Sequence, residues 1–157
     1  GKLSSESETG QNVVAQPASA PSPELTFSAF RSANVSRCVK WHPQGIASWS
    51  PSDWLTAVTG ELGELASLLK MRNRERDGLP GNKFSPTNKQ VADELADVLT
   101  YLDLLAEVLG VDLGRAAAEK FNEVSVRVGF PDRIDTRTAF ERTYDENAAR
   151  RGQYKEE

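Results

Sequence analysis

Two pairs of acidic residues, each spaced acid-x-x-acid, are the side chains of this sequence best suited to chemistry. Glu61 and Glu64 form the first pair, and Glu94 and Asp97 form the second. Residues i and i+3 share one face of a helix, so each pair sets two negative charges side by side. A single pair of this kind is most often a solvated helix face. Exposed, it costs roughly 0.2–0.5 kcal/mol, and the cost rises when the pair is desolvated.

The apolar periodicity around both pairs favours a buried edge over a solvated face. In residues 51–72 the apolar stripe consists of Trp54, Val58, Leu62, Leu65, Leu68 and Leu69. In residues 88–109 it consists of Val91, Leu95, Val98, Leu102, Leu105 and Leu109. Both helices carry their acids at the same offset from the stripe. If the two stripes pack together, up to four carboxylates converge at the rim of one core.

Such a cluster needs compensation, either by cationic side chains or by a divalent metal. The chain contains one histidine and one cysteine, so it lacks the nitrogen and sulfur ligands of structural zinc. A set of oxygen ligands suits Mg²⁺, with Mn²⁺ as a possible substitute. The acid pairs therefore predict a carboxylate–Mg²⁺ site in a helical bundle.

The elements that must position these acids are predicted to be all-α. We expect helices over about 23–39, 51–72, 88–109 and 113–128, since no strand periodicity occurs. Ser50 with Pro51, Thr87 or Asn88, and Asp112 are expected to start the last three helices. Gly110 and Gly129 fit the position after a helix end.

Composition divides the chain into three parts. Residues 1–23 are rich in Ser, Gln, Ala and Pro and are predicted to be disordered. Residues 24–131 form the helical domain. The charged residues 132–157 are expected to form a short helix or a tail ordered by a partner subunit.

Bulk properties limit the classes of function. The net charge of −4 gives no general attraction for a nucleic-acid polymer. No apolar run reaches the roughly 18 residues of a membrane span, and no secretory signal pattern is evident. The lone Cys38 is expected to be a small buried residue and fits a cytoplasmic location.

The order of the motifs resembles the MazG-like all-α nucleoside triphosphate pyrophosphohydrolases. Residues 54–65 are similar to the first motif of that family, residues 93–102 to the second, and residues 120–127 to the helix that follows. The resemblance implies a four-helix bundle of the MazG-like type that works as a homodimer or homotetramer with Mg²⁺. It also implies conversion of a (deoxy)nucleoside triphosphate to monophosphate and pyrophosphate, and a role in nucleotide-pool sanitation. Glu61 or Glu64 is the candidate catalytic base.

The resemblance also gives candidates for contacts with the nucleotide, each with a plainer alternative. Lys120, Asn122 and Arg127 would face phosphates, although a solvated helix face explains the two cations equally well. Tyr101 is a phosphate contact or a core tyrosine. Trp49 and His42 are candidates for a base pocket, whereas Trp54 is expected in the core. The basic residues Arg72, Arg74, Arg76, Lys83 and Lys89 are a solvated surface or steer the triphosphate.

Two alternatives remain open. The chain could be a related all-α hydrolase, either dUTPase-like or a phosphoribosyl-ATP pyrophosphohydrolase. It could instead be a non-catalytic helical oligomer that binds divalent metal or nucleotide. Metal-dependent release of pyrophosphate separates the second alternative from the enzymes.

Overall fold

The computed structural model describes residues 24–42, 44–138, 141–143, 145–146 and 149. The elements in these residues are all helical, which confirms the all-α prediction. They are α1 (Phe27–Trp41), the short 3₁₀ helix η1 (Ile46–Ser48), α2 (Pro51–Arg76), α3 (Asn88–Val108) and α4 (Leu113–Val128). The predicted disorder of residues 1–23 lies outside the described residues, as does much of the segment 132–157. Residues 130–138 have no regular secondary structure.

Side-chain caps fix the starts of α2, α3 and α4 at the predicted positions. Ser50 and Asp53 form a reciprocal capping box on α2, which also has Pro51 in its first turn. Thr87 and Gln90 form the same arrangement on α3. At α4 the Asp112 side chain accepts a hydrogen bond from the backbone N of Arg115 at 2.9 Å. These contacts satisfy backbone donors that the first turn of a helix leaves free.

Two helix limits differ from the prediction by four residues. Helix α1 begins at Phe27 rather than near residue 23, because the Thr26 hydroxyl accepts a hydrogen bond from the Ala29 backbone N at 3.1 Å and caps the helix there. Helix α2 continues to Arg76 instead of ending at Arg72. The chain first turns away at Gly78, which has a φ of 66°, so Asn73 does not interrupt the helix.

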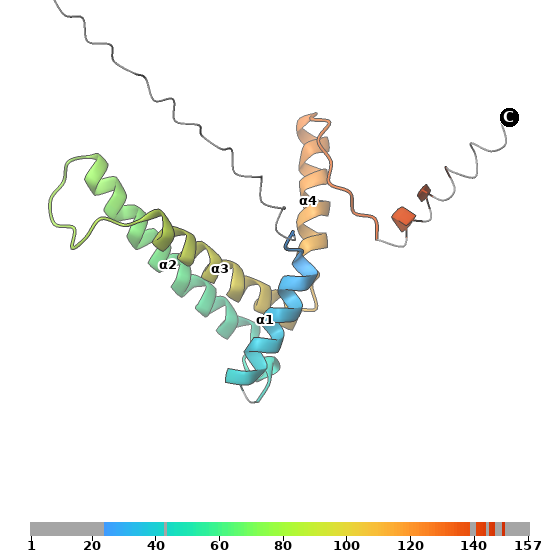
Figure 1. The fold of residues 1–157 in the computed structure, drawn as a ribbon, viewed down its shortest axis with the longest axis horizontal. Helices are drawn as coiled ribbons and strands as arrows, with labels where there is room; N and C mark the ends of the chain where they lie inside the picture. Colours follow the sequence, from blue (N-terminus) through green and yellow to red (C-terminus); the bar gives the residue numbers. More distant parts are fainter. Residues whose placement is uncertain (1–23, 43, 139–140, 144, 147–148, 150–157) are drawn as a thin grey trace, which may run out of the picture.

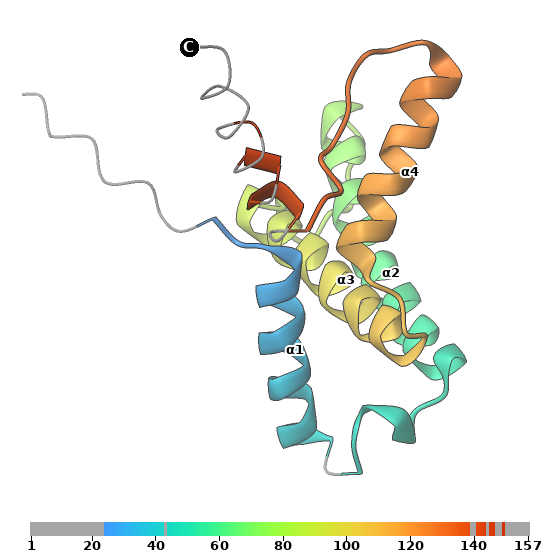
Figure 2. The ribbon, with the colours of Figure 1, turned by 90° about the vertical axis from the view of Figure 1, so that its right-hand side faces the viewer.

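The two long helices, α2 and α3, lie side by side and antiparallel (Figure 1). Helix α1 packs against α3 at one end of this pair, and α4 packs mainly on α1. Figure 2 shows the segment after α4 running back along that helix. The core consists of Cys38, Trp54 and Leu104, which confirms the predicted burial of Cys38 and Trp54.

The predicted apolar stripes are only partly buried in a single chain. The following stripe residues are exposed: Leu62, Leu69, Leu95, Leu102 and Leu109. One helix–helix contact covers only part of a stripe that is 100° wide or more. Among the described residues, α1 contacts α3 at one end only, and α4 packs against α1. Neither helix covers the exposed leucines of the two stripes. A four-helix bundle is therefore not formed by the described part of one chain.

Within the described part of the chain, no helix combines the length and the apolar character that a membrane crossing requires.

Candidate active site

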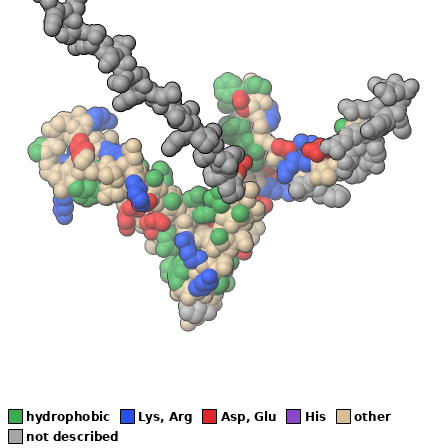
Figure 3. Space-filling model, in the orientation of Figure 1, with side chains coloured by type: hydrophobic (Ala, Val, Ile, Leu, Met, Phe, Trp, Pro, Cys, Tyr) green, Lys and Arg blue, Asp and Glu red, His purple; other side chains and the backbone are tan. Residues whose placement is uncertain are grey.

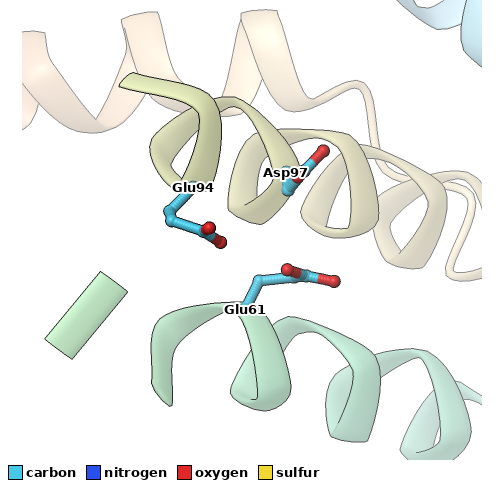
Figure 4. A group of neighbouring side chains, drawn as sticks. All are labelled: Glu61, Glu94 and Asp97. Atoms are coloured by element: carbon cyan, nitrogen blue, oxygen red, sulfur yellow. The ribbon is translucent and has the colours of Figure 1, made fainter. Parts of the chain in front are cut away.

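Three of the predicted acids meet where α2 and α3 face each other (Figure 4). One carboxylate oxygen from each of Glu61, Glu94 and Asp97 lies within 4.8 Å of the others. Glu61 and Glu94 are half-buried, and Asp97 is exposed. The i, i+3 spacing on α3 sets Glu94 and Asp97 on one side of that helix, and the antiparallel packing brings Glu61 opposite them.

The carboxylates of this cluster repel one another, so a bound cation would stabilise them. Burial raises the pKa of Glu61, and the charges of Asp97, Glu64 and Glu94 raise it further. The pKa of Glu94 is also raised, first by burial and then by nearby carboxylates. The Oε2 atom of Glu94 is buried without a hydrogen-bond partner in the described structure. A buried carboxylate oxygen beside two like charges is unfavourable, and a bound cation would stabilise it.

Glu64 stands slightly apart from the other three acids. Its side chain is exposed and does not belong to the group within 4.8 Å. Its charge nevertheless raises the pKa of both Glu61 and Glu94, so it borders the cluster. The structure therefore brings three of the four predicted ligands together and leaves Glu64 at their edge.

This donor set fits a hard divalent cation. Carboxylate oxygens are the ligands that Mg²⁺ and Mn²⁺ prefer, and the group contains no histidine or cysteine. The Glu94 Oε2 atom, which has no hydrogen-bond donor within the described ranges of the chain, is available as a ligand atom. The arrangement can hold a metal ion with open positions for other oxygen ligands.

The predicted base-pocket residues also come together, in an aromatic group beside the acids. The rings of His42 and Trp49 lie 4.8 Å apart, and those of Trp49 and Trp54 lie 4.6 Å apart. The ring of Trp54 is 6.3 Å from that of Tyr101. Burial raises the pKa of Tyr101, as do the charges of Glu61 and Asp97, so Tyr101 links the aromatic group to the acids.

The predicted phosphate contacts on α4 make other contacts in this chain. Lys120 forms an ion pair with Glu123 at 2.7 Å. Asn122 donates to the Ile134 carbonyl at 2.8 Å and accepts from its backbone N at 2.7 Å, which fixes the segment after α4. Arg127 is exposed. Because α4 packs mainly on α1, the described fold does not bring these three residues into the acid cluster.

One buried network of hydrogen bonds and ion pairs, between α1 and α3, was not predicted from the sequence. Asp103 of α3 is 1% exposed and accepts from Arg31 Nε at 2.7 Å and from Asn34 Nδ2 at 3.1 Å. Arg31 also bonds Glu107, at 2.5 Å. The partners lie about 70 residues apart in sequence, so helix periodicity gives no signal for the contact. The network fixes the first half of α1, through Arg31 and Asn34, on α3.

Fold and site together define a class: an all-helical chain with a carboxylate cluster between two antiparallel helices. No family model matches the sequence. A stretch of 74 residues, 46% of this chain, is 39% identical to dCTP pyrophosphatase 1 of Mus musculus. The corresponding stretch is 40% identical to dCTP pyrophosphatase 1 of Homo sapiens. In both cases the match covers 42% of the relative, so the chain spans less than half the length of the curated relatives it matches.

Proposed function

We propose that this chain is a nucleoside triphosphate pyrophosphohydrolase, a hydrolase acting on acid anhydrides. It would convert a (deoxy)nucleoside triphosphate to monophosphate and pyrophosphate and serve nucleotide-pool sanitation in the cytoplasm. The observation that carries the proposal is the trio of carboxylates within 4.8 Å, one of them with a buried oxygen that has no hydrogen-bond partner in the described structure. The similarity to dCTP pyrophosphatase 1 supports the reaction class and makes dCTP the first nucleotide to test.

In this proposal Glu61, Glu64, Glu94 and Asp97 hold Mg²⁺, with Mn²⁺ able to substitute. When bound, the metal supplies positive charge for the phosphate oxygens. Glu61 or Glu64 removes the proton from the attacking water. Glu61 is half-buried among the other acids, and Glu64 is the more accessible of the two.

The aromatic group is proposed to hold the nucleobase and the sugar side. His42 and Trp49 offer ring faces for stacking, and Tyr101 lies between them and the acids. The Ser48 hydroxyl is 3.0 Å from His42 Nδ1 and orients that ring. Stacking of this kind contributes about 1–3 kcal/mol per base.

Lys120, Asn122 and Arg127 are proposed to contact phosphates in an assembly of several chains. Leu62 and Leu69 on α2 and Leu95 and Leu102 on α3 are exposed. In an antiparallel pair with facing acids, these leucines are offset from the acids in the same sense on both helices, so they line one side of the pair. A homodimer or homotetramer that covers this side forms the expected four-helix bundle and repositions α4 relative to an acid cluster.

The deciding experiment measures pyrophosphate and monophosphate released from dCTP and from a panel of canonical and modified triphosphates. We expect turnover with Mg²⁺, none with EDTA, and a loss of at least about 100-fold in Glu94→Gln. Asp93→Asn is the matched control, because Asp93 is the neighbouring acid and pairs with Lys89 at 2.6 Å. A folded protein that binds Mg²⁺ but hydrolyses no member of the panel would contradict the proposal and favour the non-catalytic oligomer.

A further inference from the structure

A pocket lined in part by basic and amide side chains lies apart from the acid cluster, where the α2–α3 loop folds against the last turns of α2. Its volume is about 500 Å³. Lys70, Met71 and Arg74 line it from α2, and Asn82 and Lys83 line it from the loop; among the residues that the structure describes, no acidic side chain lines it. Figure 3 shows Lys and Arg side chains around this loop, and a group of acidic side chains further along the α2–α3 pair.

The loop is fixed on the helix by specific contacts. Asn82 Nδ2 donates to the Met71 carbonyl at 2.7 Å, and Arg74 donates to the Pro80 carbonyl. Gly81 has a φ of 102°, and a Cβ there would lie 3.1 Å from Arg74 Nη2. Because glycine is favoured in this conformation and leaves room for Arg74, the loop sequence itself shapes the pocket.

Three basic residues near the pocket, outside its lining, have partners of their own. Arg72 donates to the Pro86 carbonyl and to the Asn88 side chain. Arg76 forms an ion pair with Asp77, and Lys89 forms one with Asp93. These three cations are accounted for by local structure.

No acidic partner of the pocket's cations occurs in the part of the chain that the structure describes. Lys70 and Lys83 form no hydrogen bond or ion pair within the described part of the chain. The neighbouring acid, Glu75, faces the loop instead, where it accepts from Ser85 Oγ at 3.0 Å and from Asn82 Nδ2 at 3.5 Å. The negative end of the α2 dipole stabilises cations in its last turns. That effect does not account for Lys83, which comes from the loop and faces the same cavity.

We propose that this pocket binds a phosphate-type oxyanion without the help of a metal. Lys70, Lys83 and Arg74 supply the positive charge, and these charge-assisted contacts are the strong class of hydrogen bond for an oxyanion. Lys70 lies six residues beyond Glu64 on α2, about 9 Å along the helix axis, which separates the pocket from the acid cluster. The oxyanion is either free pyrophosphate or phosphate, or the phosphate end of a nucleotide.

The test is calorimetric titration of the full chain with inorganic pyrophosphate in EDTA. We expect binding that the double variant Lys70→Gln/Lys83→Gln weakens by at least about tenfold. The double variant Arg76→Gln/Lys89→Gln removes the same charge from paired cations and should stay within about twofold of the original affinity. Absence of binding to the unmodified chain, or an equal loss in both variants, overturns the proposal.

Hydrolysis kinetics with Mg²⁺ identify the source of the oxyanion; this arm alone rests on the proposed function. If the pocket takes the phosphate end of the substrate, Lys70→Gln/Lys83→Gln raises KM. If it takes free pyrophosphate, KM is unchanged and inhibition by added pyrophosphate weakens. If neither KM nor the inhibition by added pyrophosphate changes in this variant, the proposal is contradicted. Because the titration in EDTA needs neither metal nor turnover, its failure is distinguishable from a failure of the proposed hydrolysis.

Discussion

Glu94 is the acid whose surroundings most strongly require a cation, because one of its oxygens is buried without a donor in the described structure. We predict that Glu94→Gln lowers the affinity for Mg²⁺ by at least about tenfold. The same variant should raise the melting temperature in EDTA, since it removes a charge that Glu64 and Asp97 repel. Titration calorimetry and thermal unfolding measure the two effects. Asp93→Asn, which removes the smallest of the like charges acting on Glu94 and no cluster oxygen, should change both far less. An unaltered Mg²⁺ affinity in Glu94→Gln would count against a metal role for this cluster.

The raised pKa values of Glu61 and Glu94 predict how stability depends on pH. Both groups bind protons more tightly in the folded state than in the unfolded state, where the ordinary value is 4.5. In EDTA their contribution to the unfolding free energy is therefore present below pH 4.5 and is lost as pH rises through the folded values. Urea unfolding at several pH values should show this loss as the difference between the unmodified chain and Glu61→Gln/Glu94→Gln. A difference that grows in the opposite direction would contradict the raised pKa values.

Metal binding should show the opposite pH dependence at the same residues. A carboxylate must lose its proton before it can hold a metal ion, so the Mg²⁺ affinity should rise with pH through the folded pKa values of Glu61 and Glu94. Calorimetric titrations with Mg²⁺ over this pH range measure the effect. An affinity independent of pH would show that neither carboxylate binds the metal.

At the scale of elements, the contact of α1 with α3 depends on the buried Asp103. Arg31→Gln removes its cation and leaves a carboxylate that is 1% exposed with Asn34 as its remaining side-chain partner. We predict a loss of about 3 kcal/mol in the unfolding free energy, measured with urea. Arg115→Gln breaks the exposed pair with Glu119 and should cost less than about 1 kcal/mol. An equal loss of unfolding free energy in the two variants would show that the buried ion pair stabilises the fold no more than the exposed one.

The elements also show which parts of the structure the sequence could predict. The starts of α2, α3 and α4 were predicted because a cap such as Ser50 or Asp112 acts on backbone within three residues of itself. The meeting of Glu61 with Glu94 followed from helix periodicity and the packing of two apolar stripes. The burial of Asp103 and the position of α4 were not predicted, because they depend on contacts between helices distant in sequence.

At the scale of the whole molecule, the exposed leucines of α2 and α3 predict self-association. A row of apolar side chains on one side of a helix pair, left uncovered in the described chain, is typical of an interface between subunits. We predict that the chain sediments as a dimer or tetramer and that Leu62→Glu/Leu95→Glu sediments as a monomer with unchanged helical circular dichroism. Leu79→Glu is the matched control, because Leu79 is equally exposed but lies in the α2–α3 loop. If assembly brings α4 of one copy to the acids of another, the monomeric variant should also lose pyrophosphate release while it still binds Mg²⁺. A fully active monomeric variant would show that each chain completes its own site. An unmodified chain that sediments as a monomer would contradict self-association through these leucines.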